Sequence, residues 1–147
     1  MINKESLFIG CWVHVPCLVD EVEGINVNRR IRQLYDDSCD VEGFKELKYS
    51  EIEPIPITPE ILEKNGFIKD GYTNLSPDYC LETKEYCICV NLTLNCDKRT
   101  HIICENKLTG CVSSIDEERS SANRKQLHVQ DLEVLIWVAG INKEIIV

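Results

Sequence analysis

Glu51-Ile-Glu-Pro-Ile-Pro-Ile-Thr-Pro-Glu-Ile-Leu-Glu-Lys-Asn-Gly-Phe67 is the stretch that decides how this chain folds, because a proline-rich connector becomes a short helix within it. Its first two prolines lock their own φ angles and push the preceding residues toward extended conformations, so no helix can begin before Thr58. Thr58 is a favourable N-cap, Pro59 suits the first helical position, and Asn65-Gly66 provides the left-handed residue that ends a helix. The stretch therefore predicts an extended connector and then a linking helix over residues 58–67.

Short apolar and β-branched runs precede the helix, and such runs are typical of strands. Pro16 should end the first strand, because proline cannot donate to a ladder of hydrogen bonds. We expect strands at residues 7–15, 18–27, 30–35, 44–49 and 51–57. The segments between them are too short for crossover helices, so consecutive strands should pair in antiparallel order and curl on themselves. The sequence thus predicts a small SH3-like β-barrel over residues 1–57.

The chain beyond the linking helix predicts a second antiparallel sheet and one further helix. Residues 68–78 and 116–125 have the composition of loops. We expect strands at residues 79–83, 86–94, 100–104 and 108–115. Residues 127–139 carry apolar side chains at helical spacings and form the best amphipathic helix in the chain. The predicted fold class is α+β, in which residues 68–147 hold a sheet and a C-terminal helix as one compact unit. The length of the chain allows one ordinary domain or two very small ones.

Charge limits the classes of partner. The formal net charge is -9, from 25 acidic and 16 basic residues, and it disfavours direct binding to nucleic acid, which requires a basic stripe. The densest acidic cluster contains Asp36, Asp37, Asp40 and Glu42. One interpretation is a solvated turn, and the other is an acidic face for a basic protein or a weak site for a hard cation. The ligand spacing of a calcium-binding loop is absent.

The chain does not open with a charged region followed by an apolar core, and no apolar run approaches the ~20 residues that span a bilayer. We therefore expect a cytoplasmic protein without a membrane segment. Nine cysteines is a high and odd number. In a cytoplasmic protein they are expected as reduced thiols and not as a disulfide framework.

Most of the cysteines, with one histidine, lie between Cys80 and Cys111. Cys87 and Cys89 should share one face of a strand, and His101 and Cys104 could bring further ligands to a zinc ion. The tight Cys-x(2–4)-Cys pairs of structural zinc sites are absent, and a thiol on a strand is by default a small buried hydrophobe. Three interpretations remain open, namely core cysteines, a metal site and a redox pair.

No phosphate-binding loop, nucleophile elbow or His-Glu-x-x-His motif is present, so the sequence names no reaction for an enzyme. The two tryptophans, Trp12 and Trp137, are each expected to fill a core, and either one would mark an interface if it were exposed. For a protein partner, the candidate contact residues are Trp12 and the acidic cluster.

Three segments together carry a resemblance to a known family. They are Ile9-Gly-x-Trp-Val13, the block Glu51–Phe67, and the tail Val129-x-Asp-Leu-Glu-x-Leu135 with Gly140-Ile141. The chain resembles a family of small uncharacterised proteins encoded by gut Bacteroidales genomes and their phages. Members often have histidine where this chain has Gln130 and asparagine where it has Cys11, and residues 68–125 lie outside the resemblance. The family has no assigned activity, so the resemblance implies a phage or mobile-element context and no mechanism.

Two functional hypotheses follow. The first is a non-enzymatic, acidic interaction protein of phage or mobile-element origin that counteracts or modulates a host protein. The alternative is a module that binds a small molecule or a metal ion, with zinc as the candidate, through the cysteine- and histidine-rich sheet. A homodimer built on the C-terminal helix is a further expectation.

Overall fold

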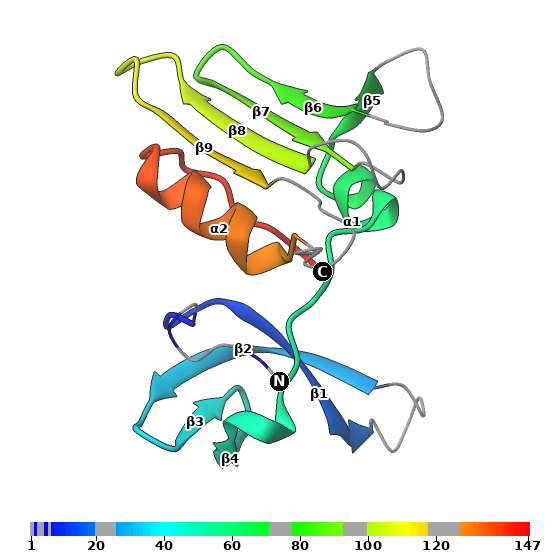
Figure 1. Ribbon diagram of the computed structural model, residues 1–147, viewed down its shortest axis with the longest axis vertical. Coiled ribbons are helices and arrows are strands. Elements are labelled where there is room, and N and C mark those ends of the chain that lie inside the picture. The colour runs from blue at the N-terminus through cyan, green and yellow to red at the C-terminus, as the bar shows by residue number, and fades with distance from the viewer. Residues whose placement is uncertain are drawn as a thin grey trace. The chain divides into compact units, whose positions relative to one another are not determined.

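The computed structural model describes residues 2, 5, 7–19, 26–70, 78–92, 100–117 and 127–147. These residues form an α+β fold in which all paired strands are antiparallel (Figure 1). The chain divides into two compact units. The first contains Met1–Pro56, His128–Gln130 and Val147, and the second contains Ile57–Leu127 and Asp131–Ile146.

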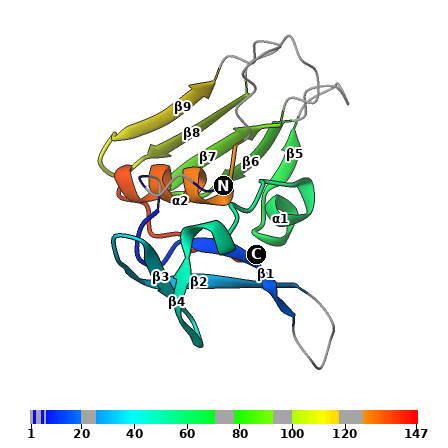
Figure 2. The same ribbon diagram turned by 60° about the horizontal axis from the view of Figure 1, so that its bottom comes forward.

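The first unit is built on a four-stranded sheet with the order β1-β2-β3-β4. Its strands are β1 (Trp12–Val19), β2 (Asn26–Leu34), β3 (Ser38–Val41) and β4 (Phe44–Lys48). A short 3-10 helix, η2 (Tyr49–Glu51), follows β4. Figure 2 shows the two long strands β1 and β2 together with the shorter β3 and β4 of the same sheet. Alternate side chains of β1, β2 and β3 point into a core that includes Val13, Val15, Ile31 and Cys39.

The strands of this unit differ from the prediction at several points, one of which is β3, where a turn was one of the interpretations. β1 continues through Pro16 to Val19, and its register shifts between Val15 and Val19. Pro16 lies within this irregularity, where the missing N–H disrupts no regular ladder. The expected break before Arg30 is also absent, since β2 runs unbroken from Asn26 to Leu34.

The connector to the second unit is extended, as its prolines require, but it is not a regular strand. Glu53 and His14 exchange backbone hydrogen bonds of 2.8 and 2.9 Å, which form an isolated bridge to β1. Pro56 forms a second isolated bridge, to His128.

The second unit begins with α1 (Pro59–Lys64), and both of its ends follow the prediction. Thr58 Oγ1 accepts a hydrogen bond from the backbone N–H of Ile61 at 3.3 Å. Asn65 is the C-cap, and Gly66 after it has a φ of +87°, the left-handed conformation that glycine adopts without strain. The buried Leu62 and Phe67 anchor the helix in its unit. α1 belongs to the second unit.

A five-stranded antiparallel sheet with the order β5-β6-β7-β8-β9 makes up most of the second unit. Its strands are β5 (Ile68–Asp70), β6 (Asp78–Glu82), β7 (Tyr86–Asn91), β8 (Thr100–Asn106) and β9 (Val112–Glu117). β5 was predicted as part of a loop, because its three residues are too few to show a strand pattern. Residues 71–77, most of that predicted loop, and 118–126 lie outside the described part of the chain.

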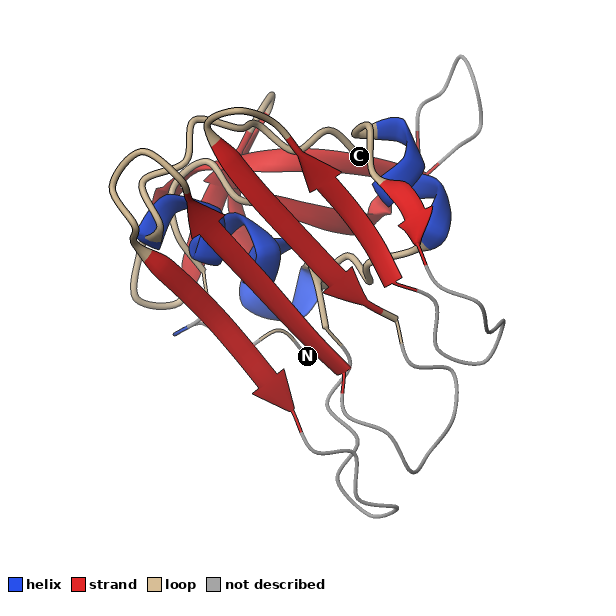
Figure 3. Ribbon diagram, turned by 90° about the horizontal axis from the view of Figure 1, so that it is seen from above, coloured by secondary structure: helices blue, strands red, loops and turns tan. Residues whose placement is uncertain are grey.

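α2 (Val129–Val138) lies along one face of this sheet (Figure 1). Leu132, Ile136 and Ala139 are buried on its inner side, and the Ser113 hydroxyl of β9 donates a hydrogen bond of 2.6 Å to the Leu135 carbonyl. Asn106 at the end of β8 donates to the carbonyls of Ala139 and Gly140, which lie just beyond the helix. Figure 3 looks onto the other face of the sheet, with the helices behind the strands.

The C-terminal tail is held by the cap of α1. Asn65 is buried, and its Nδ2 donates to the carbonyls of Ile61 and Ile146 at 2.7 Å each. Its Oδ1 accepts from the Ile146 N–H at 2.8 Å, and the adjacent Ile145 is buried. One asparagine therefore both ends a helix and binds a segment 81 residues away. Within the described residues, no helix has the length and apolar character needed to cross a membrane.

Candidate functional site

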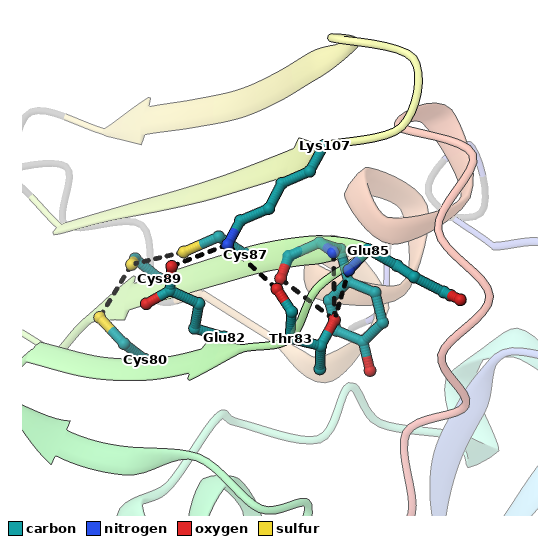
Figure 4. A network of polar contacts seen from close by, with 8 residues as sticks. Cys80, Glu82, Thr83, Glu85, Cys87, Cys89 and Lys107 are labelled. Atoms are coloured by element: carbon teal, nitrogen blue, oxygen red, sulfur yellow. Dashed lines mark hydrogen bonds and ion pairs between the residues drawn. The ribbon is translucent and has the colours of Figure 1, made fainter.

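A cluster of three thiols lies on the face of the five-stranded sheet opposite α2. Cys80 of β6 stands directly across from Cys89 of β7, and Cys87 lies two residues before Cys89 on the same strand. Side chains two residues apart on a strand, and side chains directly opposite on neighbouring strands, point to the same face. All three thiols therefore share one face, and we call them the thiol cluster (Figure 4).

The turn between β6 and β7 sets this register. The Thr83 hydroxyl accepts hydrogen bonds from the backbone N–H groups of Glu85 and Tyr86 at 3.2 and 3.1 Å. The Thr83 N–H donates to the Tyr86 carbonyl at 2.8 Å, which closes the turn. A threonine hydroxyl commonly holds a tight turn in this way. Because the turn is fixed, each pair further along the hairpin is fixed as well.

The thiols are close to one another. The sulfur atoms of Cys80 and Cys89 are 2.8 Å apart, and those of Cys87 and Cys89 are 3.9 Å apart. All three side chains are half-buried. Cys89 is thus the central thiol of the cluster.

An exposed ion pair flanks the cluster beside Cys87. The Lys107 ammonium donates to a Glu82 carboxylate oxygen at 2.7 Å and to the Thr83 carbonyl at 3.0 Å (Figure 4). The hydrogen bond from Lys107 lowers the pKa of Glu82, and the same bond raises the pKa of Lys107. The positive charge of Lys107 also favours the Cys87 thiolate, although burial opposes it more strongly.

Burial is the main influence on the acidity of the thiols. It raises the pKa of Cys87 and of Cys89 to about 11, and it raises that of Cys80. The acidic groups facing the cluster from neighbouring positions act in the same direction, and they are Asp70, Asp78 and Glu82. The thiols are therefore protonated at neutral pH, which does not suit a catalytic nucleophile.

Only two of the four predicted zinc ligands, Cys87 and Cys89, are brought together. Cys104 stands opposite Ile88 and is buried on the α2 side of the sheet, whereas Cys87 and Cys89 point to the other side. His101 is on the same face as the thiol cluster but pairs with Asn91, beyond the position opposite Cys89. Across the described residues, no group of three or more His, Cys, Asp and Glu side chains is arranged to hold a metal ion.

The prediction of core cysteines applies to part of the set. Cys11 and Cys39 are buried in the first unit and Cys104 in the second, whereas Cys111 is exposed. Burial raises the pKa of Cys104 to about 12. None of the seven cysteines whose side chains are described forms a disulfide. Cys96 and the side chain of Cys17 lie outside the described part.

The acidic cluster is partly built into the first sheet. The carboxylate of Asp40 accepts hydrogen bonds from the Tyr35 hydroxyl at 3.1 Å and from the Glu46 N–H at 2.8 Å. Glu46 has a φ of +57°, so Asp40 stabilises a left-handed residue in the β3–β4 hairpin. Asp40 thus has a structural role that its position in a charged run did not indicate.

The other three acidic side chains differ in their environments. Glu42 pairs with Arg32 at 2.8 Å, an exposed ion pair of the kind that contributes little to stability. Asp36 and Asp37 are exposed in the turn between β2 and β3. They are the members of the cluster that best fit an acidic contact surface.

The two tryptophans have different environments. Trp12 is half-buried, and the Arg30 guanidinium lies 4.3 Å from the centre of its ring, a cation–π contact. Trp137 is 79% exposed on α2, so the prediction that it fills a core is wrong. The helical spacing of apolar residues did not distinguish the two sides of α2, because both sides carry them.

Trp137 has apolar neighbours on the outer side of α2. Val134 and Val138 are also exposed, and positions three and four residues apart lie on one helix face. We call these three residues the Trp137 patch. Large apolar side chains that remain exposed together are typical of interaction surfaces.

Sequence reasoning did not pair Cys80 with Cys89, although a signal for the pair was present. Counting outward from a turn at Lys84-Glu85 matches residue 82 with 87 and residue 80 with 89. Comparison of the chain with protein-family models, with curated proteins and with solved structures finds no match. The candidate sites therefore rest on the thiol cluster and the Trp137 patch themselves.

Proposed function

We propose that this protein is a non-enzymatic interaction protein of phage or mobile-element origin that binds and modulates a host protein. The observation that carries the proposal is the exposure of Trp137, which is 79% accessible beside Val134 and Val138. Tryptophan is among the residues most enriched at the energetic centres of protein interfaces. An exposed tryptophan within an apolar patch therefore favours a binding function over a purely structural helix.

The exposed area of Trp137 is sufficient to anchor a partner. A tryptophan side chain buries about 200 Å² when covered, and roughly 25 cal/mol is gained for each Å² removed from water. With 79% of Trp137 available, covering it would contribute roughly 4 kcal/mol before the costs of association. This value lies within the range of measured hot spots.

The negative net charge of the chain favours a protein partner with a basic surface. The chain carries a net charge of -9, and Asp36 and Asp37 are exposed in the β2–β3 turn. Complementary charge mainly accelerates encounter and selects among partners, and salt weakens this effect. We therefore infer that the partner carries a basic surface, and that a separate apolar pocket on it accepts Trp137.

The resemblance to proteins of gut Bacteroidales and their phages supports the mobile-element origin and a location in the cytoplasm of the host cell. We also infer that the first unit is an SH3-like barrel. Its consecutive strands β1 to β4, the 3-10 helix η2 after them and the bridge from Glu53 back to His14 support this inference. SH3-like barrels host many unrelated functions, so this fold leaves the partner open.

The test compares three full-length proteins on beads, namely the wild type, Trp137→Ser and Ile68→Ser. Ile68 is 74% exposed on β5 and is the matched control for loss of an exposed apolar side chain. Each protein is incubated with lysate of a Bacteroidales host, and bound proteins are quantified by mass spectrometry. A protein that is enriched on the wild type is then produced in pure form, and its affinity is measured by calorimetry.

We expect Trp137→Ser to weaken binding roughly 30- to 800-fold, which corresponds to about 2–4 kcal/mol. Ile68→Ser should change the affinity by less than about threefold. A purified partner that binds the wild type and Trp137→Ser equally would contradict the proposal. Sedimentation of the protein alone provides a second check, because a wild-type dimer that dissociates in Trp137→Ser would assign the patch to a homodimer instead.

A second candidate function is a module that binds a metal ion or a small molecule through the thiol cluster. Because no group of described residues is already arranged for a metal ion, the thiols would have to rearrange to hold one. Cys89 lies 2.8 Å from Cys80 and 3.9 Å from Cys87, and thiolates are good ligands for soft metals such as zinc. Native mass spectrometry and elemental analysis of protein purified without chelators provide the test. Stoichiometric zinc that is lost in a Cys89→Ser variant would support this function, and metal-free wild-type protein would count against it.

A further inference from the structure

The thiols of Cys80 and Cys89 have the geometry from which a disulfide can form without movement of the backbone. Their sulfur atoms are 2.8 Å apart, compared with about 2.05 Å in a disulfide. The two residues are directly opposite in the antiparallel β6–β7 pair. Residues in that relation have Cα atoms about 4.5–5.5 Å apart, inside the ~4.4–6.8 Å range of disulfides. The bond therefore needs mainly rotation of the two side chains.

The alternative pair, Cys87 with Cys89, fits less well. These residues lie on one strand with a single residue between them, so their Cα atoms are about 6.6 Å apart, near the upper limit for a disulfide. Their sulfur atoms are separated by 3.9 Å. The residue directly across from Cys87 is Glu82, which cannot form such a bond. Cys80 is therefore the preferred partner of Cys89.

Access distinguishes this pair from the other thiols. Cys80 and Cys89 are half-buried on the sheet face that α2 does not cover, so a small reagent can reach them. Cys11, Cys39 and Cys104 are buried within the two units. A thiol must be both accessible and near a second thiol to form an intramolecular disulfide by exchange. Among the seven described cysteine side chains, the thiol cluster combines both properties.

We propose that Cys80 and Cys89 form a reversible cross-strand disulfide by exchange with a small-molecule disulfide of the glutathione class. The Cys80 thiolate attacks one sulfur of the oxidised reagent, whose S–S bond breaks, and one glutathione leaves as a thiolate. The Cys89 thiolate then attacks the Cys80 sulfur of the mixed disulfide, and the second glutathione leaves. The two departing thiolates take up the two protons, and the two electrons lost by the cysteines reduce the reagent. Excess reduced thiol reverses both steps.

The shared hydrogen bond, in which either sulfur can be the donor, sets the order of attack. When Cys89 donates to Cys80, the bond stabilises the Cys80 thiolate and lowers its pKa, which offsets part of the increase caused by burial. The same bond holds the proton on Cys89 and raises its pKa. In that arrangement Cys80 ionises first and is the attacking thiol, and the same disulfide results when the two thiols exchange roles. This inference is independent of whether the protein binds a host partner.

The test equilibrates the full-length protein with oxidised and reduced glutathione at several ratios, at about pH 8, where exchange is faster than at neutral pH. Free thiols are blocked with N-ethylmaleimide, and the protein is digested with trypsin without reduction. Cleavage after Lys69, Lys84 and Lys98 places Cys80 on a different peptide from Cys87, Cys89 and Cys96. A disulfide from Cys80 therefore appears as two joined peptides, and fragmentation identifies the second cysteine. Exposed Cys111 reports whether the reagent is active.

We expect a link between Cys80 and Cys89 whose amount increases with the share of oxidised glutathione and that disappears with excess reductant. The matched variants Cys87→Ser and Cys89→Ser remove neighbouring thiols of the same strand, and the link should remain in the first and be lost in the second. The proposal is wrong if Cys111 becomes glutathionylated while Cys80 stays unlinked at every ratio. It is also wrong if Cys80 links mainly to Cys87 or Cys96. The mapping of the wild type decides these outcomes even if a variant fails to fold.

Discussion

Replacing Asn65 with alanine should destabilise the second unit by roughly 3 kcal/mol, at about 1 kcal/mol for each hydrogen bond lost. The substitution removes three bonds, to the carbonyls of Ile61 and Ile146 and from the Ile146 N–H, with distances of 2.7, 2.7 and 2.8 Å. If the tail then detaches, exposure of the buried Ile145 adds a cost of roughly 1.5–3 kcal/mol. These terms are coupled, so we expect a total of about 3–5 kcal/mol.

The assay is equilibrium unfolding in urea, combined with hydrogen exchange that follows the amide of Ile146. Asn142→Ala is the matched control, because Asn142 is exposed and its replacement should change the free energy of unfolding by less than about 0.5 kcal/mol. Asn65→Asp keeps an acceptor for the Ile146 N–H but presents a carboxylate to two carbonyls. It should therefore be at least as destabilising as Asn65→Ala until the carboxylate is protonated at low pH.

The role of Asn65 would be refuted if Asn65→Ala lost less than about 1 kcal/mol while the Ile146 amide stayed protected. Such a result would mean that packing of the tail, and not the asparagine, holds the C-terminus. Equal losses in Asn65→Ala and Asn142→Ala would lead to the same conclusion.

Three further predictions concern the turn after α1 and the thiol cluster. Gly66→Ala should lower the free energy of unfolding in urea by roughly 1–2 kcal/mol, because a φ of +87° strains any L side chain. The added Cβ itself would meet only Leu81, at 3.7 Å. An unchanged free energy of unfolding would contradict the left-handed conformation. Alkylation of Cys87 and Cys89 by iodoacetamide should accelerate about tenfold per pH unit from neutral pH toward their pKa of about 11, as mass spectrometry can measure. A rate that levels off near pH 8 would show that burial does not suppress their ionisation. The Cys80–Cys89 disulfide closes a loop of ~10 residues, so oxidation should raise the free energy of unfolding by up to roughly 2.7 kcal/mol. Dithiothreitol should reverse this gain. An equal gain on oxidation of Cys80→Ser would exclude this pair as its source.

The sequence was most informative where neighbouring residues determine the conformation. Thr58, Pro59 and Gly66 each specify one backbone state, and α1 begins and ends where they indicate. The antiparallel sheets and the position of α2 in the chain also follow from local patterns of apolar residues. By contrast, β3 lies within the charged run that suggested a turn, because the partners that make it a strand are in β2 and β4.

The candidate sites also depend on pairing between strands, which the local sequence does not reveal. The proximity of Cys87 to Cys89 was readable from their spacing, but the pairing of Cys80 with Cys89 depends on a register set by the Thr83 turn. The separation of Cys104 from the cluster depends on its position opposite Ile88. A shift of one residue in that register would turn a side chain to the other face of the sheet.

By itself, the sequence determined the acidic charge, the boundaries of α1 and the α+β class, because each depends on composition or on residues close together in the chain. Only the tertiary structure decided that Asn65 holds Ile146, that three thiols meet on one face and that Trp137 stays exposed. These features depend on which distant strands pair and on which side of α2 the sheet covers. Hydrogen bonding and burial across the fold select among arrangements that the local sequence allows equally.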